Sequence, residues 1–465
     1  MTRRQALRQA AVGFGSLALA DLLTRAGVTP IGEGIPVIGG PLAARCPHFP
    51  ARAQRIIFLF MHGGPSHVDT FDHKPALRRD AGKPLPFDKP RIQFAKTGNL
   101  RPSPWEFKPY GQCGAWVSDL FPHVGSLADE LCFIKSVHGT NEAHGGALLK
   151  LHTGSDTFVR PSMGSWISYG LGTENQNLPS FITINPTLGH GGVGNWSSAF
   201  LPATHQGTPI GGSQGKKDHA SIAYLGEGAD HAQQRAQLDL LAEINRSHLI
   251  ETGPDPELEA RIQSFELAFK MQTEAPQVFD LSGETPATRQ LYGLDDPKTE
   301  TFGRQCLQAR RLSERGVRFV QVTHGYWDQH EKLTEDHGRL AHEVDRPIAG
   351  LLRDLKSRGL LEDTLVWWGG EFGRTPTVQG TDGRDHHPHA FTMWLAGGGV
   401  KPGFSYGKTD EYGFYLADEK VHIHDFHATL LYLLGLEHER LTYRFGGRDF
   451  RLTDVDGKVV REIVG

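Results

Sequence analysis

RIIFLFMHGGP, residues 55–65, is the stretch of sequence that decides the fold. Residues 56–61 are an unbroken apolar run, and the two glycines and the proline that follow are typical of a loop. A strand that is apolar at every position is buried on both faces, as central parallel strands in α/β proteins are. We therefore expect a sheet whose carboxyl edge opens into a loop that begins at His62.

The rest of the chain alternates apolar runs with amphipathic segments. Further strands are predicted over 130–137, 179–185, 316–325, 363–370 and 391–396, and helices over 255–272, 342–359 and 425–435. Alternating strands and helices indicate an α/β fold: a three-layer sandwich with a mostly parallel central sheet, helices on both faces and long loops. Gly359 is expected to end the second of these helices.

Composition and charge limit the class of protein. The chain has 465 residues, of which 38% are apolar and 22% charged, as in a globular protein with a substantial core. A net charge of −4 provides no footprint for nucleic acid. The four cysteines form no CxxC pair, which excludes a zinc finger and leaves a Cys113–Cys132 disulfide open.

The amino terminus is similar to a twin-arginine export signal. Arg3 and Arg4 precede an apolar run over residues 10–20, which is too short to span a membrane. We predict a signal peptide and spacer over 1–44 and a single domain over 50–464. The twin-arginine export machinery would then be a partner, and the mature protein would be periplasmic or otherwise extracytoplasmic. The alternative is an amphipathic amino-terminal helix.

Histidines and carboxylates gather where the predicted strands end. The chain has 24 histidines. Because carboxyl ends of parallel strands meet at one edge, segments distant in sequence should bring these side chains together. Histidine with Asp or Glu suits Zn or Mn better than Ca or Mg, so we expect one or two such divalent ions. Taken singly, each residue also fits a turn, a cap or an ion pair, such as Glu371 with Arg374. The candidate ligands are His62, Asp69, His324, Asp328, His330, Glu371, Asp385, His386 and His389.

A set of motifs resembles a known family. They are MHGGPSHVDTFDHKP (61–75), WDQH (327–330), EFGRTP (371–376), GRDH (383–386), LAGGGVKPG (395–403) and DFHATLLYLLG (425–435). Together they resemble the bacterial domain-of-unknown-function family 1501, whose members carry twin-arginine signals and are placed among sulfatase-like proteins. The resemblance covers residues 50–464 and implies an alkaline phosphatase-like fold.

The same resemblance suggests roles for individual residues. His62 or Asp69 stands where the superfamily has its first metal acid, and Asp328 with His330 matches its Asp–His metal pair. Glu371 matches the later Asp–His dipeptide in place, and Asp385 with His386 matches it in kind. A last metal histidine would be His387 or His389. His144 occupies the position of the sulfatase nucleophile, which leaves Thr140 as the nearest hydroxyl upstream.

These residues favour a metal-dependent hydrolase of phosphate or sulfate esters, exported and acting on a small-molecule or glycan ester. The nucleophile would be water or Thr140, both activated by metal. Arg374 or Arg384 would either clamp substrate oxygens or hold the loop to Glu371 or Asp385. The alternative is a catalytically degenerate member of the same fold that binds an anionic glycan or a surface partner. Turnover of aryl phosphate and sulfate esters distinguishes the two.

Overall fold

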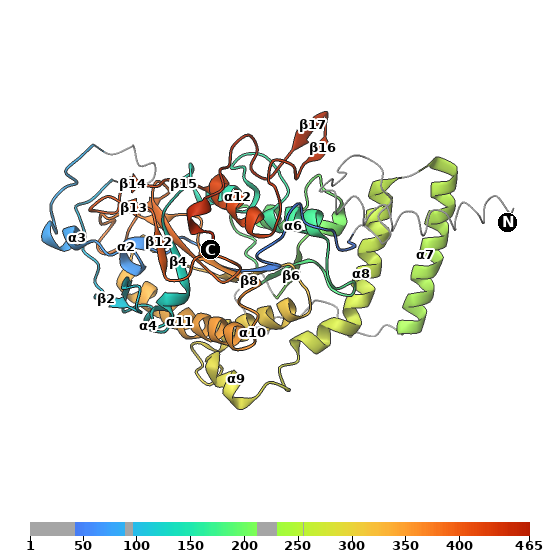
Figure 1. Ribbon diagram of the computed structural model, residues 1–465, viewed down its shortest axis with the longest axis horizontal. Helices are drawn as coiled ribbons and strands as arrows, with labels where there is room; N and C mark the ends of the chain where they lie inside the picture. Colours follow the sequence, from blue (N-terminus) through green and yellow to red (C-terminus); the bar gives the residue numbers. More distant parts are fainter. Residues whose placement is uncertain (1–41, 89–95, 212–229, 254) are drawn as a thin grey trace. The chain divides into compact units, whose positions relative to one another are not determined.

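The structure of the protein is a computed structural model, and the residues it describes are 42–88, 96–211, 230–253 and 255–465 (Figure 1). Residues 41–465 form one compact unit. The predicted signal segment, residues 1–44, falls almost entirely outside the described residues. Within the described part of the chain, no helix is both long and apolar enough to cross a bilayer.

A nine-stranded sheet organises the described residues, in the order β12-β4-β11-β8-β1-β7-β5-β6 with β15 beside β4. The quoted apolar run is β1 (Arg55–Met61), which is buried throughout and lies between β7 (Phe319–His324) and β8 (Thr364–Gly369), parallel to both. The other strands are β4 (Leu131–His138), β5 (Phe181–Ile184), β6 (Thr208–Ile210), β11 (Phe391–Ala396), β12 (Phe404–Tyr406) and β15 (Val421–His422).

One strand of the sheet runs against the others. β11 pairs antiparallel with both β4 and β8. Its beginning therefore lies at the edge where β1, β7 and β8 end. The residues that precede β11, including Asp385 and His386, are thus brought to the carboxyl edge from the opposite chain direction.

Helices cover both faces of the sheet. On one face α10 (Glu300–Glu314) and α11 (Leu333–Ser357) pack against Ile57, Leu59 and Met61 of β1. On the other face α5 (His144–Thr153), α6 (Met163–Leu171) and α12 (Ile423–Leu433) pack against Ile56, Phe58 and Phe60. Figure 1 shows α10 and α11 below the sheet, with α6 and α12 above it. The strand alternates between two cores, which confirms the predicted three-layer α/β sandwich with a mostly parallel sheet.

Shorter elements fill the loops. The remaining helices are α2 (His67–Thr70), α3 (Pro75–Arg79), α4 (Pro122–Gly125), α7 (His231–Thr252), α8 (Pro256–Phe279) and α9 (Pro286–Leu291). The small hairpins pair β2 (Phe107–Tyr110) with β3 (Ala115–Ser118), β9 (Gly373–Arg374) with β10 (His386–His387), β13 (Lys408–Thr409) with β14 (Leu416–Asp418), and β16 (Tyr443–Phe445) with β17 (Arg448–Phe450).

Local signals explain two of the helix ends. Gly359 follows the end of α11 with a φ of 68°, the left-handed conformation in which glycine closes helices. At the start of α12, His422 and Asp425 form a reciprocal capping box. The four cysteines are free thiols, so Cys113 and Cys132 are not joined.

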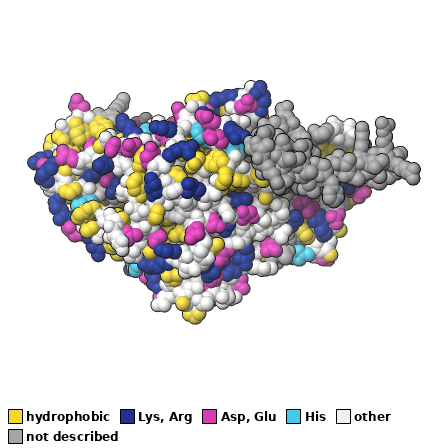
Figure 2. Space-filling view, in the orientation of Figure 1, with side chains coloured by type: hydrophobic (Ala, Val, Ile, Leu, Met, Phe, Trp, Pro, Cys, Tyr) yellow, Lys and Arg dark blue, Asp and Glu magenta, His cyan; other side chains and the backbone are white. Residues whose placement is uncertain are grey.

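The face drawn in Figure 2 intersperses Lys and Arg side chains with Asp and Glu. Charges of opposite sign at such short separations largely cancel beyond about a Debye length, ~8–10 Å. This face therefore presents no large patch of one charge sign.

Candidate metal centre

Three loops meet at the carboxyl edge of the sheet, and glycine allows them to touch. Gly63 has a φ of 114°, and a Cβ there would lie 2.7 Å from the Trp327 nitrogen. The loop after β1 and the loop after β7 are joined by the Trp327 N–H, which donates to the His62 carbonyl at 3.0 Å. Gly383 plays the same part in the loop before β11, since a Cβ there would collide with the His330 carbonyl. Gly63 and Gly383 are thus needed because the backbones of neighbouring loops approach each other closely at these positions.

Three histidines converge on one carboxylate. The Nε2 atoms of His330 and His386 each lie 3.0 Å from Oδ1 of Asp328, and 3.0 Å from each other. The Nε2 atom of His144 lies 3.2 Å from Oδ2 of Asp328. His144 is the first residue of α5, whereas Asp328 and His330 follow β7 and His386 precedes β11. Residues separated by more than 200 positions therefore share one cluster.

The other ring nitrogen of each histidine faces an acceptor. Nδ1 of His144 lies 2.7 Å from the Glu371 carboxylate, and Nδ1 of His386 lies 2.7 Å from the Glu142 carbonyl. Nδ1 of His330 lies 2.5 Å from Oε1 of Gln379. Because these partners accept hydrogen bonds, each Nδ1 carries the hydrogen, and each Nε2 of a neutral ring presents a lone pair. Metal-binding histidines are oriented in this way.

Lone pairs directed at a carboxylate oxygen require a cation between them. Ligands of a tetrahedral zinc ion at about 2.0–2.1 Å lie about 3.3 Å from one another, so spacings of 3.0 and 3.2 Å fit an ion held in common. Imidazole nitrogens with a carboxylate suit Zn or Mn rather than Ca or Mg. The donor set and its spacing thus fit a divalent ion at this cluster, with His144, Asp328 and His386 within ligand-sharing distance of one another and His330 beside His386.

The pKa shifts of these groups also indicate a site for a cation. Burial would raise the pKa of Asp328, but hydrogen bonds from the three histidines and the charge of Arg374 hold it well below its usual range. Burial would lower the pKa of His144, yet its contacts with Asp328 and Glu371 raise it to about 9. Burial lowers the pKa of His386 despite its contact with Asp328. A proton on His144 therefore occupies the position that a metal ion would take.

Polar atoms without partners lie beside this cluster. Among the described residues, Nε2 of His62 and Oδ2 of Asp385 are buried and have no hydrogen-bond partner. His62 groups with His144 and Glu371, and Asp385 groups with His330 and His386, within ligand-sharing distance. Glu371 also accepts the Gly63 N–H at 2.9 Å, which fixes its carboxylate behind His144. These groups could complete the coordination of one ion or hold a second.

His190 is a residue that the sequence analysis did not single out. It lies in the long glycine-rich loop after β5, is exposed, and has a φ of 45°. Its ring centroid is 5.0 Å from that of His144 and 6.3 Å from that of His62. The available signal was a histidine between glycines, LGHGG (188–192), in a segment that is rich in glycine and long for a mere connector.

The structure places three of the predicted ligands outside the cluster. The buried Asp69 carboxylate receives two hydrogen bonds from Arg384, at 2.7 and 3.1 Å, so it is half of a structural ion pair. His324 uses both ring nitrogens, with Glu343 at 3.0 Å and the Trp327 indole at 3.1 Å. His389 contacts the ring of His387 instead of the cluster.

The predicted catalytic residues are distributed differently. His144 is in the cluster. Thr140 is exposed, and its hydroxyl makes no hydrogen bond to the described residues. Arg374 is fully buried, and its guanidinium donates to the carbonyls of Gly63, Gly64 and Trp327 as well as to Asp328. It therefore joins the loops and orients Asp328, which leaves it unable to clamp a substrate.

Residues 53–464 match the family described as "Protein of unknown function (DUF1501)". No match was found among curated proteins. Similar solved structures include a sulfatase from Pseudoalteromonas sp., with 14% identity, 83% of this chain and 69% of that chain covered, and a TM-score of 0.36.

Two further structures are equally distant. A protein in the alkaline phosphatase superfamily from Vibrio parahaemolyticus has 10% identity, with 90% of this chain and 76% of that chain covered and a TM-score of 0.37. The alkaline phosphatase from the Antarctic bacterium TAB5 has 9% identity, with 78% and 96% covered and a TM-score of 0.32. Likenesses at this level concern the path of the chain and not its chemistry.

Proposed function

The chain belongs to the DUF1501 family, and from its carboxyl-edge cluster we propose that it is a metal-dependent hydrolase of phosphate or sulfate esters. The observation that carries the proposal is the set of three histidines whose Nδ1 atoms are held by acceptors while their Nε2 atoms converge on Asp328. Structural ion pairs do not need three such oriented lone pairs.

Zn or Mn is the proposed ion, and when bound it would neutralise the charge of the ester and lower the pKa of the attacking oxygen. The chain holds the ligands in position. Glu371 fixes the tautomer of His144, Glu142 and Gln379 do the same for His386 and His330, and Arg374 orients Asp328. The site would thus be preorganised, and its ligands would have to move little when the ion binds.

The exposed side of the cluster is where a substrate would enter. His190 is an exposed residue next to His144, and His62 lies beside both. Arg374 and Arg384 are fully buried and committed to other groups, so the described part of the site meets an ester with imidazoles rather than guanidinium groups. Because the Thr140 hydroxyl makes no hydrogen bond to the described residues, water is the proposed nucleophile.

Export belongs to the same proposal. The support for it is the Arg3-Arg4 pair followed by the apolar run over 10–20. The mature protein would then act in the periplasm or elsewhere outside the cytoplasm, on a small-molecule or glycan ester.

The test is turnover by the purified protein, stripped of metal and reloaded with Zn or Mn, of 4-nitrophenyl phosphate, methyl 4-nitrophenyl phosphate and 4-nitrophenyl sulfate. We expect release of nitrophenol from at least one ester that depends on metal and is abolished by Asp328→Asn. Metal binding without turnover of any ester would contradict the proposal.

That second result would support the degenerate alternative, in which the metal-loaded protein binds an anionic glycan or a surface partner. One observation favours this alternative: among the described residues, no hydroxyl side chain hydrogen-bonds to His144, His330 or Asp328. Retention of the protein on a sulfated polysaccharide resin, together with absent turnover, would identify it.

A further inference from the structure

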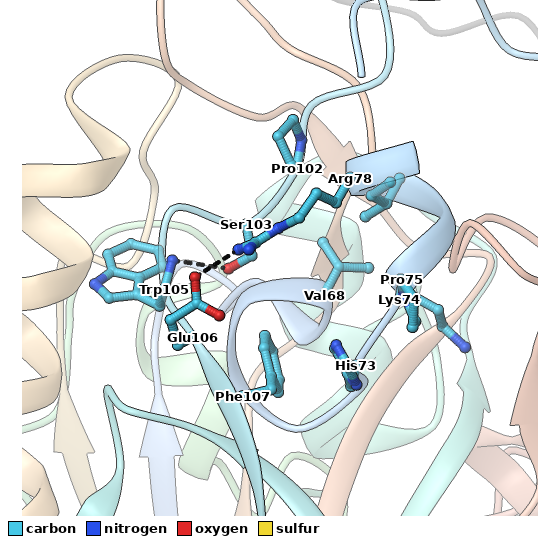
Figure 3. A pocket seen from close by; sticks show the side chains of 11 residues that line it. Val68, His73, Lys74, Pro75, Arg78, Pro102, Ser103, Trp105, Glu106 and Phe107 are labelled. Atoms are coloured by element: carbon cyan, nitrogen blue, oxygen red, sulfur yellow. Dashed lines mark hydrogen bonds and ion pairs between the residues drawn. The ribbon is translucent and has the colours of Figure 1, made fainter. Parts of the chain in front are cut away.

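A cavity of about 210 Å³ lies apart from the metal centre and shares no residue with it. Its walls come from α2, α3 and the segment 102–107, which leads into β2. Figure 3 shows Val68 and His73 on one side of the cavity, with Trp105 and Glu106 on the other. The cavity is partly open to solvent and mixes apolar with charged lining residues, so it can admit a ligand of moderate polarity.

Aromatic rings form two of its walls and are held in place by stacking. The His73 ring stacks on Phe107, with centroids 4.8 Å apart, and on Trp116, with centroids 4.6 Å apart. Trp105 is half-buried and stacks on His337 at 6.4 Å. Both faces of the His73 ring are therefore covered, and Trp105 is the lining ring that a ligand ring can stack on; because Trp105 is already held in place, little entropy is lost on binding.

An exposed ion pair spans the mouth of the cavity. Arg78 donates to Oε1 of Glu106 at 2.8 Å, and the two side chains are 63% and 74% exposed. A pair this exposed contributes little to stability and opens at little cost. Within the described residues, the other N–H groups of Arg78 and Oε2 of Glu106 have no hydrogen-bond partner. Donors and acceptors placed side by side match two adjacent hydroxyl groups, which accept from one and donate to the other.

The charges that line the cavity balance. Lys74 lies 3.1 Å from the buried Asp72 carboxylate, and Arg78 is paired with Glu106. Burial lowers the pKa of His73, which favours its neutral form. A cavity with paired charges gives no net attraction to an anion, and its polar groups would be left unsatisfied by a purely aromatic ligand.

We propose that this cavity binds a neutral sugar ring, as part of a carbohydrate chain, through stacking on Trp105 and paired hydrogen bonds to Arg78 and Glu106. The inference does not depend on the proposed hydrolase activity, because no residue of the metal centre takes part.

The test is binding of neutral tetrasaccharides of glucose, galactose, mannose and N-acetylglucosamine to the full chain, by saturation-transfer NMR and calorimetry, with metal and after chelation. A sulfated galactose tetrasaccharide and a decaproline peptide are the competing ligands. The variants are Trp105→Ala and Glu106→Gln. Glu411→Gln is the matched control, since Glu411 pairs with Arg79 at 3.0 Å with similar exposure, 59% and 61%, but does not line the cavity.

We expect at least one neutral tetrasaccharide to bind with and without metal. Trp105→Ala and Glu106→Gln should each weaken that binding by about tenfold, and Glu411→Gln should leave it within twofold. Because Trp105→Ala removes a packed ring, the thermal unfolding of this variant is measured as well. If Trp105→Ala proves to be unfolded, the test rests on Glu106→Gln, which keeps the shape of the side chain. No binding of any neutral tetrasaccharide would overturn the proposal. So would binding of only the sulfated sugar or the decaproline, or binding that neither variant changes.

Discussion

Replacing Glu371 with Gln should weaken binding of the ion at Asp328, because Glu371 orients the His144 ligand of that ion. Its buried carboxylate accepts the Nδ1–H of His144 at 2.7 Å and the Gly63 N–H at 2.9 Å. Gln has the same shape but no charge, and its NH₂ group would meet one of these donors. The tautomer that directs Nε2 of His144 toward Asp328 is then less favoured. Loss of such a carboxylate behind a metal histidine weakens affinity about 10–100-fold, or about 1.4–2.7 kcal/mol.

The assay is a competition titration of Zn and Mn against a chromophoric chelator. Glu343→Gln is the matched control, because Glu343 pairs with His324 at 3.0 Å, and His324 lies outside the cluster. Glu343→Gln should keep the wild-type affinity. The reasoning would be refuted if Glu371→Gln bound metal within twofold of the wild type, or if Glu343→Gln lost as much affinity.

Three further results are expected. The pKa of His144 is raised to about 9 from 6.5, so its bound proton stabilises the metal-free protein fully below pH 6.5. In urea unfolding of the metal-free protein, the free energy of unfolding should fall by about 3 kcal/mol as the pH rises from 6.5 through 9. The variant His144→Gln should not show this fall. Burial lowers the pKa of His337 to about 3, so stability falls as pH drops from 6.5 toward 3; acid unfolding of His337→Gln should be less steep by about 1.4 kcal/mol per pH unit. Arg384→Gln leaves the Asp69 carboxylate buried without its partner and should destabilise by about 3–5 kcal/mol in guanidinium unfolding; a change below 1 kcal/mol would contradict a structural role for that pair.

The layers of the fold follow from the sequence because they depend on period and burial. The continuous apolar run of β1 indicates a strand buried on both faces, and that strand lies at the centre of the sheet. The direction of β11 does not follow, since an apolar strand has the same pattern in either direction. Its antiparallel pairing depends on the route taken by residues 375–390, which is a tertiary matter.

The sequence predicts that histidines and carboxylates gather at one edge of the sheet, but it does not predict which of them lie in the cluster. Position at a strand end places Asp328 and His330 at the carboxyl edge, whereas His386 lies there because the β11 strand that follows it is antiparallel. The same rule includes Asp69, because no sequence signal reveals that Arg384, more than 300 residues away, takes its carboxylate. His190 was missed for the opposite reason. Its loop does follow a strand, β5, but His190 stands well beyond the strand end, and the sequence does not reveal the path of so long a loop.

The role of Arg374 could not be decided from the sequence. The sequence left Arg374 equally suited to clamping a substrate and to holding a loop, because a guanidinium does both with the same donors. Its complete burial and its contacts with backbone carbonyls decide for the loop. Solvent exposure, which cannot be read from a motif of six residues, is the quantity that separates the two.

The central claim is a metal held by Asp328 and the three histidines, and elemental analysis of the purified protein tests it most directly. Wild type, Asp328→Ala and His324→Ala would be compared after the same reconstitution with Zn or Mn. The account predicts about one or two equivalents in the wild type and in His324→Ala, and less than about a tenth of that in Asp328→Ala. A wild-type protein that stays empty, or an Asp328→Ala protein that keeps its metal, would contradict it.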